Sequence, residues 1–233
     1  MCGRYASSRS STELATLFDA VDVTEGSADR GYNLAPTRRV PIVRVSRSRE
    51  RRVVSAARWG LVPPWSKSPK NGPRMMNARS ETVTTLPAYR SPFVRKRCVV
   101  PADGWYEWQK GPRGRQPYYT TARDGEPLVF AGLWEMWGDD EPLMTCTVLT
   151  APAVGELQPI HDRMPLLLSR DRIDDWLTDR GAAENLLAGV DEGLVEGLEI
   201  RPVGSAVGNV RNDSVELTKR VEPSEPPSAP TLF

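Results

Sequence analysis

Histidine and cysteine are scarce in this sequence of 233 residues, which contains one histidine and three cysteines. Cys2, Cys98 and Cys146 are widely spaced and odd in number, a pattern typical neither of a disulfide framework nor of a zinc site. We therefore expect a reducing, cytoplasmic setting and neither a metal nor another cofactor. The sequence also lacks a run of about 18 apolar residues, so no membrane span is expected. Its first residues lack the apolar stretch of a signal peptide.

Acidic side chains are nearly absent from one segment of the chain. The net charge of the whole sequence is only +1, but residues 37–97 carry 16 basic and 2 acidic groups, a net charge of +14. Residues 98–233 carry 12 basic and 23 acidic groups. The basic segment is a candidate surface for a polyanion such as nucleic acid. It is equally compatible with a solvated face whose charge the acidic half balances.

The apolar pattern predicts a single α+β domain that is mainly β, because the strands are too clustered for alternating β and α units. Ser10 and Glu13 form a capping box, which predicts a helix directly after Ser10. Further helices are expected after Ser169 and over about residues 183–189. Strands are expected where Val, Ile and aromatic residues gather, over 39–46, 52–59, 97–108, 117–122, 127–135, 143–150 and 198–203.

Proline and glycine mark the remaining segments. Residues 62–76, with four prolines, and residues 111–117 are expected to form a loop and a turn. We expect the folded domain to cover residues 1–221 and the proline-rich segment 222–233 to be a disordered tail.

Cys2 has the most distinctive chemistry in the sequence. If the initiator methionine is removed, as is usual before a small second residue, the chain begins with a cysteine whose α-amine and thiol stand on adjacent carbons. Such an amine has a reference pKa of about 8 and is partly neutral at physiological pH. A neutral amine condenses with an aldehyde to a Schiff base, and the thiol can then close a five-membered thiazolidine ring. Taken alone, however, a cysteine here is more often simply a small second residue.

Three other residues are candidates for proton transfer or for holding the amine. Glu107 lies among aromatic residues, where desolvation would raise its pKa into the range of a general acid or base. His161, the single histidine, is a candidate proton shuttle. The Asn77 amide could hold an α-amine in place. Each also has a plainer interpretation: Glu107 as an exposed strand residue, His161 as a structural histidine and Asn77 as a turn residue.

Two tryptophans, Trp59 and Trp65, stand inside the basic segment. Basic residues interleaved with tryptophan are typical of single-strand binding, in which cations hold phosphates and rings stack on bases. Trp65 follows two prolines and is expected at the surface, whereas Trp59 is expected in the core. The Arg79 guanidinium is a candidate phosphate ligand.

Taken together and in this order, these motifs resemble the SOS response-associated peptidase (SRAP) family. Any one motif is weak, but seven in order, anchored at the start of the chain, are highly specific, and they span about residues 2–220. The residues that carry the resemblance are 1–5 (MCGRY), 32–37 (YNLAPT), 59–65 (WGLVPPW), 77–82 (NARSET), 103–108 (DGWYEW), 161–165 (HDRMP) and 210–213 (VRND).

The resemblance implies a single compact domain with a twisted, barrel-like β core and a few peripheral helices. It implies a protein that senses abasic sites in single-stranded DNA and protects them in a thiazolidine DNA–protein crosslink through Cys2 after Met1 removal. A basic DNA-binding domain of this size can act as a monomer, which is the state expected here. Such a protein would lie in the cytoplasm, at the nucleoid when bound to DNA. The family name also implies a peptidase role, which would be the removal of residues ahead of the cysteine.

The resemblance also implies a role for each matching residue. Asn77 would orient the α-amine, Glu107 would carry protons during Schiff-base formation, and His161 would assist opening of the sugar ring and reversal of the crosslink. Phosphates would be held by the arginines that match the family's motifs, and further DNA contacts would come from a loop tryptophan and, by a looser match, a threonine. These DNA-binding residues are Arg4, Arg79, Arg163, Trp65 and Thr150.

Other activities use the same residues. A thiol hydrolase with an N-terminal nucleophile would use Cys2 with the α-amine as base and would release a fragment from an amide. A plain single-strand binding module would bind intact and abasic strands equally. A reader of modified bases is a third alternative, for which the sequence offers no specific pocket signature.

Overall fold

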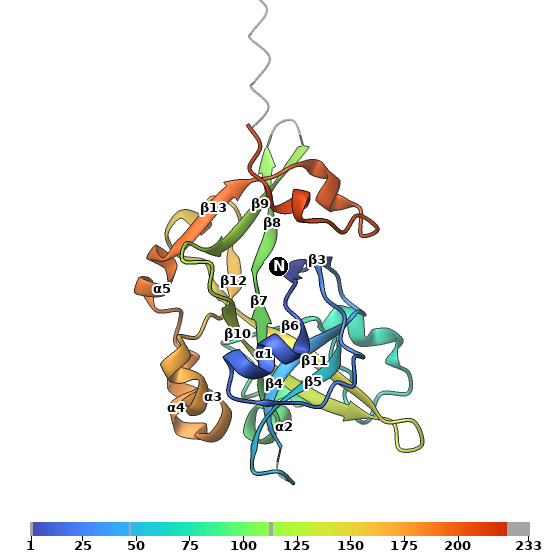
Figure 1. Ribbon diagram of the computed structural model, residues 1–233. Coiled ribbons are helices and arrows are strands. Elements are labelled where there is room, and N and C mark those ends of the chain that lie inside the picture. Colours follow the sequence, from blue (N-terminus) through green and yellow to red (C-terminus); the bar gives the residue numbers. More distant parts are fainter. Residues whose placement is uncertain (1, 47, 112–113, 223–233) are drawn as a thin grey trace, which may run out of the picture.

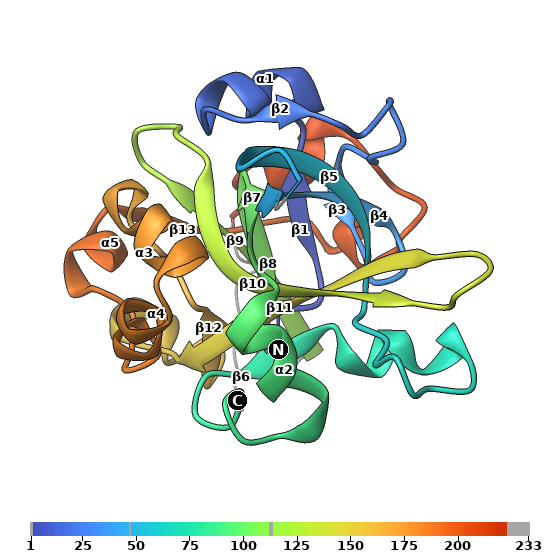
Figure 2. The ribbon, with the colours of Figure 1, turned by 90° about the horizontal axis from the view of Figure 1, so that it is seen from below.

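A closed β-barrel forms the centre of the molecule (Figures 1 and 2). The structure is a computed structural model that describes residues 2–46, 48–111 and 114–222. Antiparallel pairs join neighbouring barrel strands, and a parallel pair between β11 and β5 closes the ring. The barrel strands are β4 (Arg39–Ser46), β5 (Arg51–Trp59), β7 (Arg97–Ala102), β10 (Leu128–Trp137) and β11 (Leu143–Pro152). The mixed barrel confirms the expected fold class.

A second sheet stands above the barrel in Figure 1 and contains the first strand of the chain. In spatial order its strands are β13 (Leu198–Pro202), β9 (Gly114–Ala122), β8 (Gly104–Gly111), β1 (Tyr5–Ser7) and β3 (Gly31–Leu34). Three short strands extend the barrel sheet instead: β2 (Val21–Asp22), β6 (Asn77–Arg79) and β12 (Arg163–Pro165). Because β6 and β12 both pair with β11, segments far apart in sequence meet along one barrel strand.

The single strand expected over residues 97–108 is wrong, because the chain changes sheets at Asp103. Strand β7 belongs to the barrel and β8 to the second sheet. The Asp103 carboxylate accepts hydrogen bonds from the Ser8 amide and from Arg9, which ties the start of β8 to the end of β1. At Gly104 a Cβ atom would lie 2.4 Å from the Thr120 carbonyl oxygen, so only glycine fits this turn into the second sheet.

Short helices cover the outside of the barrel. The first, α1 (Ser11–Leu17), begins after the predicted capping box. Helices α3 (Ile173–Thr178), α4 (Arg180–Leu186) and α5 (Glu192–Glu196) lie together on one side in both views, and α4 begins three residues before the expected position. The other elements are helix α2 (Pro87–Arg95) and the 3₁₀ turns η1 (Pro69–Met75), η2 (Gly155–Leu157), η3 (Arg170–Arg172), η4 (Ser205–Gly208) and η5 (Val215–Thr218).

Proline explains two of the differences from the expected elements. Helix α2 begins with Pro87 in the first turn, where a missing amide costs nothing, and Arg97 donates to the Phe93 and Val94 carbonyls at its end. The expected loop over residues 62–76 contains η1, whose first residue is also a proline. Strand β9 begins at Gly114, so residues 114–117 of the expected turn belong to a strand. Apart from Glu222, the predicted tail lies outside the described residues, as does Met1.

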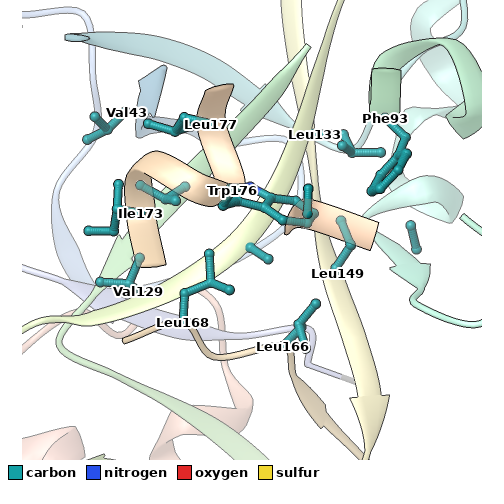
Figure 3. Packing of buried hydrophobic residues seen from close by; sticks show 14 of the residues in the cluster. Val43, Phe93, Val129, Leu133, Leu149, Leu166, Leu168, Ile173, Trp176 and Leu177 are labelled. Carbon is teal, nitrogen blue, oxygen red and sulfur yellow. The ribbon is translucent and has the colours of Figure 1, made fainter. Parts of the chain in front are cut away.

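Alternating residues of the barrel strands point into two different apolar clusters. One cluster lies under the helices around Trp176, which is fully buried and donates a hydrogen bond of 2.8 Å to the Cys98 carbonyl (Figure 3). The other joins the barrel to the second sheet and contains Tyr5, Trp59, Trp105 and Cys2. Cys2, the first described residue, is therefore part of the core.

Candidate functional site

Cys2 lies at the junction of the two sheets and is completely buried. Strand β1 pairs with β8, and the Tyr106 amide donates to the Arg4 carbonyl just beyond the paired residues. This pairing leads the start of the chain along β8 toward Glu107. Burial raises the pKa of the Cys2 thiol well above its ordinary value, and the negative charge of Glu107 raises it further. The thiol is therefore protonated at neutral pH, and any bond that it forms requires a nearby proton acceptor.

Asn77 holds the backbone of Cys2. Its Nδ2 donates a hydrogen bond of 2.8 Å to the Cys2 carbonyl oxygen. The backbone just before Asn77 is also held in place, because the Met76 carbonyl accepts two hydrogen bonds, from the Val148 amide and from Trp59 Nε1. The Asn77 Oδ1 atom is buried and has no hydrogen-bond partner among the residues that the structure describes. Buried amide oxygens normally accept a hydrogen bond, so the Oδ1 atom could accept one from a donor at the start of the chain.

Glu107 faces the same region from β8, where it pairs with Tyr118 of β9. The residue is only 5% exposed. Burial is the main cause that raises its pKa from 4.5 to about 7, and the negative charge of Asp162 adds to the effect. The direction is the one expected from its aromatic neighbours in sequence. A carboxyl group with this pKa can both give and take a proton at physiological pH.

His161 lies in the turn between β11 and β12. Its Nδ1 atom accepts a hydrogen bond of 2.9 Å from the Arg163 amide and also lies 2.9 Å from an Asp162 carboxylate oxygen. One nitrogen cannot accept from an amide and carry the proton of an ion pair. Burial lowers the pKa of His161 despite Asp162, whose side chain is largely exposed, so we assign the neutral ring with its proton on Nε2.

Of the predicted DNA-binding residues, Trp65 and Arg79 lie at the surface. The Trp65 side chain follows Pro64 in the loop before η1 and is 63% exposed. Arg79 is exposed at the end of β6, two residues after Asn77. Lys67 is exposed in the same loop, and Lys70 is exposed in the first turn of η1. Ring and cations are therefore both accessible to a nucleic acid strand.

The other three predicted DNA-binding residues are engaged inside the protein. Arg4 donates to Asn33 and to the Val207 carbonyl, both at 2.7 Å. Arg163 forms a two-pronged ion pair with Glu81 and also donates to the Thr150 carbonyl. Thr150 itself is buried. Their first role in this structure is to join segments, whereas Trp65 and Arg79 remain available.

Comparison with known proteins identifies the family of this chain. The model of the family described as SOS response associated peptidase (SRAP) matches residues 1–210. The chain belongs to the SRAP family. It is 35% identical over 225 residues to the abasic site processing protein YoaM of Bacillus subtilis, covering 93% of this chain and 97% of that protein. It is 31% identical to the abasic site processing protein YedK of Escherichia coli, covering 95% and 100%.

Solved structures share the fold of this SRAP chain. A crystal structure of a protein from Bacteroides thetaiotaomicron matches 95% of this chain and all of its own with a TM-score of 0.81, at 23% sequence identity. Among the described residues, no helix has the length and apolar character needed to cross a membrane. The same part of the chain contains no group of three or more His, Cys, Asp or Glu side chains placed to hold a metal ion.

Two residues of this SRAP site were missed in the sequence. Glu81 binds Arg163, and Trp137 of β10 donates a hydrogen bond of 2.7 Å to the Ser66 carbonyl, which anchors the loop that carries Trp65. Glu81 did carry a signal, because it is one of only two acidic residues in the basic segment 37–97. Trp137 carried none, because its partner is a backbone carbonyl 71 positions away.

Proposed function

We propose that this chain processes abasic sites in single-stranded DNA and, once Met1 has been removed, protects the lesion in a thiazolidine crosslink through Cys2. The observation that carries the proposal is the hydrogen bond from Asn77 to the Cys2 carbonyl, beside a carboxyl group with a pKa of about 7. The names of the relatives, abasic site processing proteins, support this lesion as the substrate.

Asn77 prepares the nucleophile in this proposal. The α-amine of a processed chain stands on the same carbon as the carbonyl that Asn77 Nδ2 binds, so it would lie close to the buried Oδ1 acceptor. A hydrogen bond to Oδ1 would orient the amine lone pair toward an incoming aldehyde. Holding the two reactants together replaces a bimolecular encounter by a local one and accounts for a large part of the rate.

Glu107 carries the protons of the reaction. The neutral amine adds to the open-chain sugar aldehyde at C1′ and gives a carbinolamine. Protonated Glu107 donates to its hydroxyl group, which leaves as water, and the C1′–N bond becomes an iminium. The carboxylate so formed takes the proton of the Cys2 thiol, and the sulfur bonds to C1′ to close the ring. One water is released, no redox change occurs and Glu107 regains its proton.

His161 acts on the sugar. An abasic deoxyribose is mostly a closed hemiacetal, so its ring must open before the amine can attack. With Nδ1 bound to the Arg163 amide, the neutral ring presents its proton on Nε2, which would hydrogen-bond to the ring oxygen as the C1′–O4′ bond breaks. O4′ gains a proton and the C1′ hydroxyl loses one, so the opening is neutral overall and His161 keeps its proton. The same proton transfers run backward when the crosslink is released.

The exposed ring and cations account for the preference for a single strand. Phosphates would lie on Arg79, Lys67 and Lys70, and a base would stack on Trp65. A single strand can bend to place one sugar against a buried nucleophile, whereas a stacked duplex cannot. Binding should weaken as salt rises, because phosphate contacts release counterions.

The test is the intact mass of the purified protein before and after incubation with a single-stranded oligonucleotide bearing one abasic site. We expect loss of Met1 and a one-to-one adduct that forms without a reductant, since a plain Schiff base would need reductive trapping. Cys2→Ala should abolish the adduct and leave noncovalent binding intact. Cys98→Ala is the matched control, because Cys98 is equally buried but lies on a barrel strand.

Other results would favour the rival activities. Processed protein that forms no adduct but cleaves an amide would be a thiol hydrolase. Equal affinity for intact and abasic strands, without an adduct, would indicate a simple binding module. If Met1 is retained in the preparation, the incubation is repeated with protein from which it has been removed.

A further inference from the structure

We infer that Glu81 is a positioning residue of this site, whose ion pair with Arg163 holds the start of β12 where the Arg163 amide binds the His161 ring. The contribution of His161 to the reaction rests on the proposed function. The contact between Glu81 and Arg163 is a property of the folded chain and needs no DNA.

The contact ties together the two segments that flank β11. Strand β6 pairs with one side of β11, with Arg79 opposite Thr150, and β12 pairs with the other side, with Arg163 opposite Pro152. The Arg163 side chain reaches back across β11, donates to the Thr150 carbonyl and meets both oxygens of Glu81. The Ser80 amide donates to the same carbonyl, at 2.9 Å. Asn77 and His161, more than eighty residues apart, are thereby held in one frame.

The Arg163 amide is turned toward His161 and away from β11. It is bound to His161 Nδ1 and so does not pair with β11. The partner of Arg163 in register is Pro152, which has no amide to donate to the Arg163 carbonyl. The ladder with β11 continues on both sides of this pair, where the Ala153 amide donates to the Asp162 carbonyl and Met164 pairs with Ala151. The side chain therefore adds a restraint across β11 to a residue whose own amide is bound to His161.

The geometry gives Arg163 a structural partner before any phosphate is bound. Its side chain is only 13% exposed, whereas that of Glu81 is 46% exposed. A planar guanidinium bound at two points is rigid, and a lysine could not reproduce it. The hydrogen bond from Arg163 is also the main cause that lowers the pKa of Glu81, so the carboxylate stays charged at neutral pH. The positive charge of Arg163 is thus already compensated before DNA arrives.

The test uses the fact that the chain has a single histidine, so the ring nitrogens of untagged, ¹⁵N-labelled protein report on His161 alone. At pH 8 the wild type should show one neutral tautomer, with a bare Nδ1 and a protonated Nε2. In Glu81→Gln the bond to Nδ1 should be lost in part, and a mixture of tautomers should appear. Glu81→Asp keeps the charge but shortens the reach, and the same mixture there would separate geometry from charge.

Glu216→Gln is the matched control, because Glu216 forms an exposed ion pair with Lys219 far from the site. Circular dichroism and thermal melting show whether each variant is folded, and Arg163→Lys replaces any Glu81 variant that is not. Folded Glu81 variants that keep the single wild-type tautomer would overturn the inference. So would a several-fold gain in single-strand affinity with an unchanged tautomer, because Glu81 would then be a competitor of phosphate.

The reaction gives a second readout on the same variants. A misplaced His161 should slow release of a preformed adduct by about tenfold, since small errors in position are costly. Adduct formation on a substrate whose aldehyde is already open should change little. If the wild type forms no adduct, the proposed function fails and the tautomer measurement still decides the role of Glu81. If adducts form normally but the tautomer does not respond, only the role of Glu81 is lost.

Discussion

Replacing Glu107 by glutamine is expected to stabilise the folded protein while it removes the proton carrier of the proposed reaction. Burial raises the pKa of Glu107 from 4.5 to about 7. Between these two pH values the folded state therefore binds more protons than the unfolded state, and stability falls as the pH rises. The full loss is present above pH 7 and amounts to about 3 kcal/mol. Glutamine has nearly the same shape and carries no charge at any pH.

The free energy of unfolding should therefore be measured for both proteins by urea denaturation at pH 4.5 and at pH 8. At pH 4.5 the two should differ by less than about 1 kcal/mol, because the carboxyl group is neutral in the folded state of the wild type. At pH 8 the variant should be more stable by up to about 3 kcal/mol. Glu216→Gln, at an exposed site, should show no such pH-dependent difference.

The same substitution should slow adduct formation by about 10²- to 10⁴-fold, the usual contribution of a general acid or base. It should also remove the inflection near pH 7 from the rate profile. A stability difference that is the same at both pH values would mean that Glu107 is not desolvated in the folded state. Loss of activity without the gain in stability at pH 8 would refute the assignment of its pKa.

Two further perturbations test other parts of the site. His161→Ala should lengthen the lifetime of a preformed adduct by about tenfold or more, since general acid catalysis is lost, and unchanged release rates measured by gel after adduct isolation would remove this role. Trp137→Phe deletes the hydrogen bond to Ser66, which should cost about 1 kcal/mol of stability and weaken single-strand binding a few-fold by releasing the Trp65 loop. Fluorescence anisotropy with an intact strand checks this, and equal affinities would show that the loop needs no anchor.

Local patterns predicted the elements that depend on neighbouring residues. The capping box at Ser10 and the alternation in β4 and β5 identified α1 and both strands, because their determinants lie within a few positions. The division of residues 97–108 at Asp103 was not predicted. It depends on hydrogen bonds from Ser8 and Arg9, almost a hundred positions earlier, which no local pattern contains. Helix α2 was missed because Pro87 and Pro92 conceal it, although Arg97 satisfies its last carbonyls.

Local sequence patterns were even less able to predict the contacts within the site. Residue chemistry pointed to Cys2, Asn77, Glu107 and His161 one at a time, and the resemblance to a family joined them. Neither could indicate that Arg163 meets Glu81 across β11, because that contact depends on two strands pairing with opposite sides of a third. A charged side chain can bind a ligand or join two strands, and its sequence motif is the same in both cases. Exposure and partners show only which contacts it makes in the folded chain: Arg79 is exposed, Arg163 already joins two strands, and phosphate binding stays a prediction for both.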